Sequence, residues 1–137
     1  MLIQPYLFFD GRCEEAVDYY RKALGAEVTM LMRYKESPDP PPPGRVQPGS
    51  EGKIMHASFR IGETTVMASD GGCGGQPKLE GFALSLTVAD EKTAERLFGA
   101  LTDGGRVEMP LMKTFWSPRF GMVVDRFGVF WMVNVAS

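Results

Sequence analysis

The stretch LIQPYLFFDGRCEEAVDYYRKALGAEVTMLMRY, residues 2–34, carries a strand signal, a helix signal and a second strand signal in turn. Residues 2–9 are apolar and aromatic and end at a turn, which predicts a strand. Residues 14–24 repeat apolar side chains at helical spacing and end at a glycine, which predicts an amphipathic helix. Residues 26–34 predict another strand, so the stretch indicates a strand–helix–strand unit.

Two further strands are predicted after a proline-rich segment. Residues 54–61 alternate apolar and polar side chains and residues 64–69 return after a Gly-Glu turn, which predicts a β-hairpin. Residues 37–49 hold six of the ten prolines, and proline is excluded from helix interiors and central strands. We therefore expect residues 37–49 to form an extended surface loop, with a proline-rich recognition segment as the alternative.

The second half of the chain restarts the same order. Residues 82–88 predict a strand and residues 91–102 a helix, and a strand begins at residue 106. Residues 119–125 and 129–135 then predict a hairpin. The order strand–helix–strand–strand–strand, or βαβββ, therefore occurs twice.

Matching residues support this repeat. Glu14 matches Glu91, and Leu24 matches Leu101 at the same offset along the chain. A repeat of this length indicates duplicated supersecondary units that share one core. The sequence thus predicts the α+β class and a single domain built from two modules, residues 1–75 and 81–137.

Composition narrows the class of protein. The chain has 137 residues, 44% hydrophobic and 23% charged, with 15 Lys and Arg against 17 Asp and Glu. These fractions are typical of a soluble globular protein, and the balanced charge disfavours nucleic acid as a partner. No apolar run approaches the roughly 20 residues of a membrane span, so no membrane partner is expected. Residues 1–5 lack a basic segment, so we expect no signal peptide and a cytoplasmic protein whose Cys13 and Cys73 stay thiols.

Short motifs occur in a fixed order along nearly the whole chain. Together they resemble the PhnB-like branch of the vicinal oxygen chelate superfamily, which includes glyoxalase, bleomycin-resistance proteins and extradiol dioxygenases. The motifs are Pro5-Tyr6-Leu7-Phe8-Phe9-Asp10-Gly11, Glu15-Ala16, Tyr20, Leu24-Gly25-Ala26-Glu27, Met55-His56-Ala57, Ser69-Asp70, Phe115-Trp116, Arg119-Phe120-Gly121 and Asp125-Arg126-Phe127-Gly128-Val129-Phe130-Trp131.

The resemblance implies how the modules are built. Each βαβββ module gives a four-stranded sheet, and the two mixed sheets form an open cup with the helices outside. The apolar face of each strand packs on its helix, so the other face lines the cup. The residues expected to face the cup and bind a ligand are His56, Ser58, Arg60, Ser85, Thr87, Met132 and Asn134.

The resemblance also implies where a metal would be bound. The metal enzymes of the superfamily place His, Glu or Gln at four cup positions. By motif these positions fall on Gln4 or Pro5, Val66 or Met67, Ala83 and Met132. Divalent cations need nitrogen or oxygen ligands, which among these side chains only Gln4 offers. We therefore expect no metal and no cofactor.

Two groups of residues could carry chemistry. His56 is the single histidine and the candidate catalytic residue, as a general base, against the alternative of a histidine in the cavity wall. Trp116 and Phe120, with Phe115 nearby and Arg119 between them, could stack a planar or cationic ligand or simply pack in the core. We take Trp116, Arg119 and Phe120 as candidate ligand-binding residues.

Three functions fit these expectations. The first is a metal-free homodimer that binds a small apolar or aromatic molecule in the cup. The second is a lyase- or dioxygenase-like enzyme with acid–base chemistry at His56. The third is a structural or regulatory module whose own side chains fill the cup. Ubiquinone methyltransferase activity, a label given to relatives of this branch, is not expected, because the chain lacks the strand–Gly-rich loop–helix unit that binds S-adenosylmethionine.

Overall fold

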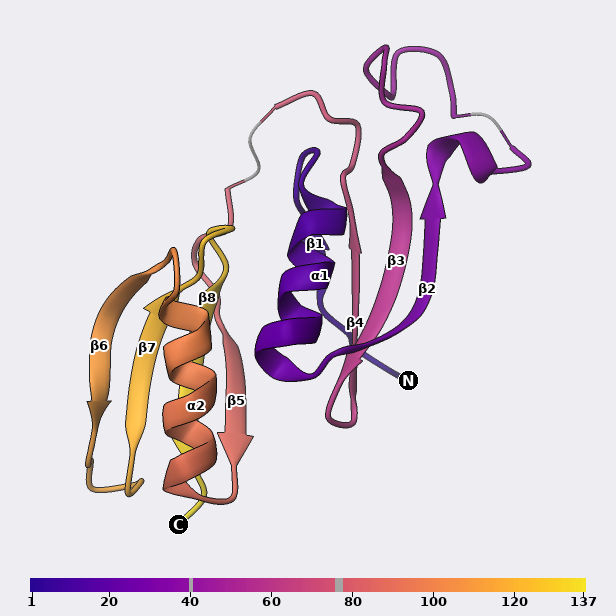
Figure 1. Ribbon diagram of the computed structural model, residues 1–137. Coiled ribbons are helices and arrows are strands. Elements are labelled where there is room, and N and C mark those ends of the chain that lie inside the picture. Colours follow the sequence, from indigo (N-terminus) through magenta and orange to yellow (C-terminus); the bar gives the residue numbers. More distant parts are fainter. Residues whose placement is uncertain (40, 76–77) are drawn as a thin grey trace. The chain divides into compact units, whose positions relative to one another are not determined.

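The computed structural model describes residues 1–39, 41–75 and 78–137. The chain divides into two compact units, Met1–Pro77 and Lys78–Ser137. Each unit has one α-helix lying over one face of its own four-stranded sheet (Figure 1). Within the described residues, neither α-helix is long and apolar enough to cross a membrane.

The first unit is a βαβββ module. Its elements are β1 (Tyr6–Phe8), α1 (Cys13–Leu24), β2 (Glu27–Arg33), the short 3-10 helix η1 (Tyr34–Glu36), β3 (Ile54–Ile61) and β4 (Thr64–Ser69). The strands are ordered β1-β4-β3-β2. β1 runs parallel to β4, while β4, β3 and β2 pair antiparallel.

The second unit repeats this topology. Its elements are β5 (Leu84–Val88), α2 (Glu91–Thr102), β6 (Arg106–Met112), β7 (Phe120–Val124) and β8 (Phe130–Val135). The strands are ordered β5-β8-β7-β6, again with one parallel pair, β5 and β8. The predicted α+β class and the tandem βαβββ order are therefore confirmed.

The first strand is much shorter than the sequence predicted. Residues 2–9 were expected to be extended, but only Tyr6–Phe8 form β1. Pro5 has no N–H group, so it cannot donate to a sheet, although its carbonyl oxygen accepts a hydrogen bond from the Met67 N–H at 2.9 Å. Pairing with β4 therefore begins only at Tyr6.

The core of the first unit lies between α1 and its sheet. Helical spacing places one apolar stripe of α1 against the sheet, and the central strands supply the facing residues. The stacked rings of Tyr20 and Phe59, with centroids 5.9 Å apart, lie at its centre. Other buried side chains of this core include Leu7, Ala16, Val17, Ala23, Ala57, Val66 and Ala68.

The core of the second unit lies between α2 and its sheet. The buried side chains are Ala94, Leu97, Leu101, Val123, Trp131, Val133 and Val135. Gly121 of β7 faces the helix, because a Cβ there would lie 2.8 Å from the Phe98 ring. Only glycine allows the strand and helix to approach this closely.

Two buried aspartates, one in each module, stabilise turns by accepting hydrogen bonds. Asp70 accepts hydrogen bonds from the backbone N–H groups of Gly11, Cys13 and Ile54, at 2.7–2.8 Å. It thereby joins the end of β4, the start of α1 and the start of β3.

Asp125 has the corresponding role in the second unit. One carboxylate oxygen accepts hydrogen bonds from the N–H groups of Phe127 and Val129. The other accepts one from the indole N–H of Trp131, at 2.8 Å. Asp125 therefore shapes the turn before β8 and orients a large core side chain.

The proline-rich segment forms a loop, as its composition predicted. Residues 37–39 and 41–49 contain no helix or strand and are mostly exposed, and Pro40 lies outside the described residues. The backbone N–H of Gln47 donates to the carbonyl oxygen of Gly72 at 3.0 Å. The loop therefore packs on the Gly-rich segment that follows β4, residues 71–75.

Candidate functional site

The helix-free face of the first sheet is the face turned away from α1. Strand register places Tyr6 opposite Met67, Met67 opposite Ser58, and Ser58 opposite Met30. Because neighbours in register share a face, these side chains lie together. The face is made of Tyr6, Phe8, Met30, Met32, His56, Ser58, Arg60, Thr65 and Met67.

His56 is hydrogen-bonded through both ring nitrogens on this face. The Tyr6 hydroxyl oxygen lies 3.1 Å from Nδ1, and the Ser58 hydroxyl oxygen lies 3.3 Å from Nε2. The Tyr6 ring also contacts His56 and Phe8, with centroids 5.6 and 5.0 Å away. We call Tyr6, His56 and Ser58 the hydroxyl–imidazole trio.

Sequence analysis placed two members of the trio and missed the third. Alternation along residues 54–61 put His56 and Ser58 on one face. Tyr6 was not assigned to that face, because the run of apolar residues around it has no alternation to read. The buried Leu7 between the exposed Tyr6 and Phe8 shows the alternation only once the structure is known.

Arg60 lies on the same face but is engaged by a neighbouring strand. Its guanidinium donates to Glu27 of β2 at 2.8 Å, and both side chains are exposed. Exposed ion pairs of this kind are weak. Arg60 therefore lies on the predicted face as one half of a surface ion pair.

The helix-free face of the second sheet carries the other predicted strand residues. Register places Ser85 opposite Met132, and Thr87 opposite Asn134. Phe120 lies opposite Asn134 from β7. The face is made of Ser85, Thr87, Phe120, Met122, Val124, Phe130, Met132 and Asn134.

Asn134 has an unusual environment on this face. Its side-chain carbonyl oxygen is buried and accepts no hydrogen bond from any described residue. A buried carbonyl oxygen without a donor is unfavourable in a folded protein. The Asn134 oxygen is therefore a buried polar atom that the described residues leave unpaired.

The aromatic segment before β7 divides between core and surface. Phe120 is 8% exposed, and its ring meets Trp116 edge to face with centroids 5.3 Å apart. Phe115, which contacts Trp116, is 97% exposed. Phe120 is thus a buried member of the face, with Trp116 half covered beside it.

Arg119 is directed to the helix. Its guanidinium bonds to Glu91 at 3.0 Å and to Glu95 at 3.1 Å, both on α2. The reason is strand parity, since Arg119 precedes Phe120 and has the same parity as the helix-facing Gly121. The structure brings Arg119 to the opposite side of the sheet from Phe120.

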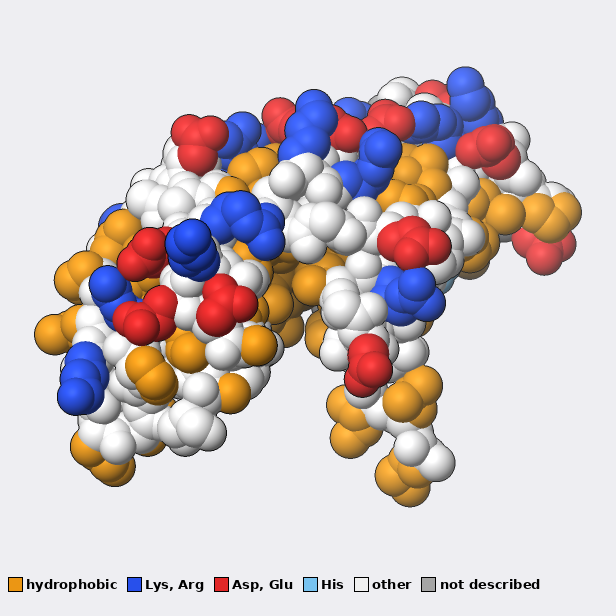
Figure 2. Space-filling view, turned by 60° about the horizontal axis from the view of Figure 1, so that its bottom comes forward, with side chains coloured by type: hydrophobic (Ala, Val, Ile, Leu, Met, Phe, Trp, Pro, Cys, Tyr) orange, Lys and Arg blue, Asp and Glu red, His pale blue; other side chains and the backbone are white. Residues whose placement is uncertain are grey.

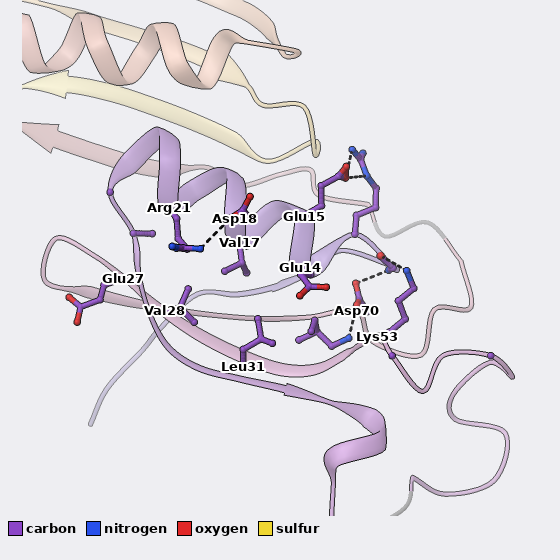
Figure 3. A pocket seen from close by; sticks show the side chains of 17 residues that line it. Glu14, Glu15, Val17, Asp18, Arg21, Glu27, Val28, Leu31, Lys53 and Asp70 are labelled. Carbon is purple, nitrogen blue, oxygen red and sulfur yellow. Dashed lines mark hydrogen bonds and ion pairs between the residues drawn. The ribbon is translucent and has the colours of Figure 1, made fainter.

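A separate groove lies between α1 and β2 (Figure 3). It encloses about 1310 Å³, and none of the residues predicted to bind a ligand lines it. Val17 points from the helix toward Val28 and Leu31 of β2, which gives the groove an apolar floor.

Charged residues on the rim of this groove form ion pairs. Arg21 bonds to Asp18 at 3.2 Å. Arg33 bonds to Glu14, and this guanidinium lowers the pKa of the Glu14 carboxyl. Periodicity reveals which face of a helix is apolar but not the spacing between helix and edge strand, so sequence analysis did not find the groove.

Neither cysteine of the chain forms a disulfide. Cys13 is a buried residue of the first turn of α1, and burial raises the pKa of its thiol far above the usual range. Cys73 is half-buried in the Gly-rich segment. Cys13 is therefore a protonated core side chain at neutral pH.

At three of the four positions where the family resemblance places a metal ligand, the side chains suit a divalent metal poorly. Met67 and Met132 lie on the two helix-free faces, and both offer thioether sulfur. Ala83, which precedes β5, offers a methyl group. Metals of this class prefer charged oxygen or imidazole ligands. Within residues 1–39, 41–75 and 78–137, no three His, Cys, Asp or Glu side chains gather as a metal site would require.

Comparison with protein families gives one match over almost the whole chain. Residues 2–134 match the family described as 3-demethylubiquinone-9 3-methyltransferase.

Three similar proteins match this chain over almost its whole length and almost the whole of their own. Protein YjdN of Escherichia coli is 37% identical over 98% of this chain and 95% of its own length. Protein PA1353 from Pseudomonas aeruginosa, which has a crystal structure, is 42% identical in sequence. Its structure matches with a TM-score of 0.86 and covers 99% of this chain and 98% of that one. A PhnB protein from Bacillus cereus is 28% identical, with a TM-score of 0.83 and coverage of 99% and 100%.

A more distant structure shares the fold alone. It is a glyoxylase/bleomycin resistance protein/dioxygenase domain from Frankia, 12% identical with a TM-score of 0.68.

Proposed function

The chain belongs to the PhnB-like family of the vicinal oxygen chelate superfamily, and on that premise we propose that it is a metal-free small-molecule binding protein. Its ligand is a small apolar or aromatic molecule held in a cup that the two modules of one domain form from their helix-free faces. The observation that carries this proposal is the first of those faces, where aromatic and thioether side chains surround the hydroxyl–imidazole trio.

The chemistry of that face suits a small apolar ligand. Tyr6 and Phe8 expose ring surface that can stack on a planar molecule. Met30 and Met67 supply flexible, polarisable side chains that adapt to varied shapes. Binding sites for small molecules combine such an apolar lining with a few placed polar groups. The trio supplies the polar groups here.

The second helix-free face supports the same proposal. It combines Phe120, Met122 and Met132 with one acceptor, the unpaired oxygen of Asn134. Each module thus presents an apolar face with few polar anchors. The groove between α1 and β2 is a weaker candidate, because Glu14, Asp18 and Arg21 on its rim are already engaged in ion pairs.

Methyl transfer, which the family's description names, is not part of this proposal. The methyl donor S-adenosylmethionine is bound by a strand, a Gly-rich loop and a helix in direct succession. The Gly-rich residues 71–75 follow β4, but the next helix, α2, begins only at Glu91. The loop therefore lacks the helix N-terminus that such a site uses.

A second candidate is a lyase- or dioxygenase-like enzyme with acid–base chemistry at His56. The hydrogen bonds from His56 to Tyr6 and Ser58 favour it, because such contacts orient a general base. The two candidates differ in the fate of the bound compound. Enzymatic action requires that the wild-type protein changes the compound's mass and that His56→Gln does not, whereas a binding protein releases it unchanged.

We further propose a cytoplasmic homodimer. The free thiols of Cys13 and Cys73 suit a reducing compartment. On the surface shown in Figure 2, Lys and Arg side chains are interspersed with Asp and Glu, which does not favour nucleic acid as a partner.

Native mass spectrometry of the purified protein tests the proposed function. We expect a dimer without stoichiometric metal, and a retained organic molecule when the host cell supplies one. A dimer that carries one metal ion per subunit would contradict the proposal. A second spectrum, recorded after dialysis against zinc, manganese and nickel salts, should show no stoichiometric uptake of metal by the protein.

A further inference from the structure

The trio limits how many hydroxyl hydrogens can be offered to a ligand. A neutral imidazole has one N–H donor and one bare nitrogen that accepts. If Tyr6 donates to Nδ1, then Nε2–H donates to Ser58 and only the Ser58 hydrogen is free. In the other tautomer the Tyr6 hydrogen is free instead. Neutral His56 therefore leaves one hydroxyl hydrogen for a ligand.

Protonation of His56 changes this count. Both ring nitrogens then donate, one to the Tyr6 oxygen and one to the Ser58 oxygen. Both hydroxyl hydrogens are released and can point outward from the sheet. The charged ring also polarises the two hydroxyl groups, which strengthens the hydrogen bonds that they donate. The trio then offers two donors next to a positive charge.

The register neighbours of His56 on β2 and of Ser58 on β4 are uncharged. Met32 lies opposite His56 on β2, and Met67 lies opposite Ser58 on β4. The charged pair on this face, Arg60 with Glu27, neutralises itself.

Tyr34 of η1 is a further titratable group near Tyr6. Burial raises the pKa of its phenol, so it stays neutral, and its hydroxyl donates to the carbonyl oxygen of Gly71. Tyr34 therefore adds no negative charge beside the two donors of the protonated trio.

We propose that the trio is an anion-recognition element and that the ligand is an aromatic or apolar acid. The carboxylate accepts hydrogen bonds from the Tyr6 and Ser58 hydroxyls, while the ring of the ligand lies against Phe8, Met30 and Met67. Because protonated His56 leaves both hydroxyl hydrogens free for the carboxylate, we expect the affinity for the acid to rise as pH falls. This inference rests on the proposed function and names its ligand class.

Two probes of equal shape separate the inference from the proposed function. They are 2-naphthoate, whose carboxylate stays ionised, and uncharged 2-naphthamide, both measured by isothermal titration calorimetry at about pH 5.5 and about pH 8. We expect both probes to bind. The dissociation constant of 2-naphthoate should be on the order of tenfold lower at the acid pH, while that of 2-naphthamide stays within about twofold.

Variants assign the pH effect to the trio. His56→Gln keeps hydrogen-bonding atoms but cannot gain a proton, so it should bind both probes with no dependence on pH. Tyr6→Phe and Ser58→Ala should each weaken 2-naphthoate binding more than 2-naphthamide binding. Thr65→Val is the matched control, because it removes a hydroxyl from the same face at a position away from His56. It should keep the pH preference of the wild-type protein.

The outcomes distinguish the two proposals. If both probes bind with equal affinity at both pH values, the anion-recognition element is wrong and the binding function stands. If His56→Gln retains the pH preference, another group causes it and the inference is again wrong. If neither probe binds at millimolar concentration, the proposed function and the inference both fail.

Discussion

Asp70 is the residue on which the first module most depends. Its buried carboxylate accepts three backbone hydrogen bonds, from Gly11, Cys13 and Ile54. Its removal would leave three N–H donors without their acceptor in a site that excludes water. Sequence analysis identified Asp70 only as a carboxylate at a turn, because the residues that it joins are far apart along the chain.

We predict that Asp70→Ala lowers the free energy of unfolding by about 3 kcal/mol. Urea denaturation followed by circular dichroism measures the change. Asp39→Ala, an exposed substitution in the proline-rich loop, is the control and should cost less than about 0.5 kcal/mol. Equal urea concentrations at the unfolding midpoint of the two variants would show that Asp70 does not stabilise the module.

At the scale of single residues, the candidate site was predictable only in part. Alternation placed His56, Ser58, Met132 and Asn134 on the helix-free faces, because the period of a strand fixes the side on which each residue lies. It did not predict that Tyr6 would meet His56, since that contact joins β1 and β3 across β4. A contact across strands depends on register, which one sequence does not reveal.

At the scale of the elements, Asp90 caps the N-terminus of α2 and makes the stability of the fold depend on pH. The backbone N–H of Thr93 donates to the Asp90 carboxylate at 2.7 Å, and this hydrogen bond lowers the Asp90 pKa. A lowered folded-state pKa stabilises the fold at pH values above the ordinary value of about 4. That contribution is lost as pH falls through the lowered pKa, because the protonated carboxyl is a poorer acceptor.

We therefore predict that Asp90→Ala lowers the melting temperature most at neutral pH. Differential scanning calorimetry between about pH 7 and about pH 2.5 should show the wild-type and variant temperatures converging as the carboxyl is protonated. A difference that grows with acidity would contradict this sign.

The contact between α2 and β7 gives a second prediction for the elements. Gly121→Ala should cost about 1–3 kcal/mol, because the new methyl would overlap the Phe98 ring. Gly99→Ala, in the exposed interior of α2 with open space around it, should instead gain about 0.5–1 kcal/mol. Thermal denaturation of both variants measures the two shifts. Shifts of the same sign would show that the close approach at Gly121 is not structurally required.

Most elements were predictable, and the exceptions have physical causes. The helix over residues 91–102 and the hairpin strands at 54–61 and 64–69 match the structure, because their apolar spacing is regular. The first strand was overestimated, because its apolar residues extend past Pro5, where pairing stops. Arg119 was expected beside Phe120, yet adjacent strand residues face opposite sides of the sheet.

On the scale of the whole molecule, the duplicated pattern was the strongest signal in the sequence. Two modules with the same strand order confirm the repeat that Glu14 and Glu91 indicated. Family membership agrees with the fold that the ordered motifs implied. Function was less predictable, because three of the four positions where the resemblance implies a metal ligand carry Met67, Ala83 and Met132 here. The proposal of a metal-free binding protein follows from those substitutions and from the apolar faces around them.

Nuclear magnetic resonance of protein with ¹³C-labelled methionine methyl groups tests that proposal most directly. The nine methionines include Met67 and Met132, one on each helix-free face, and Met67→Leu and Met132→Leu assign their signals. We predict that 2-naphthamide, added without metal, shifts both methyl signals through its ring current and leaves the signal of the exposed Met1 unchanged. A probe that binds while both signals stay in place, or that binds only after a divalent metal is added, would contradict the account.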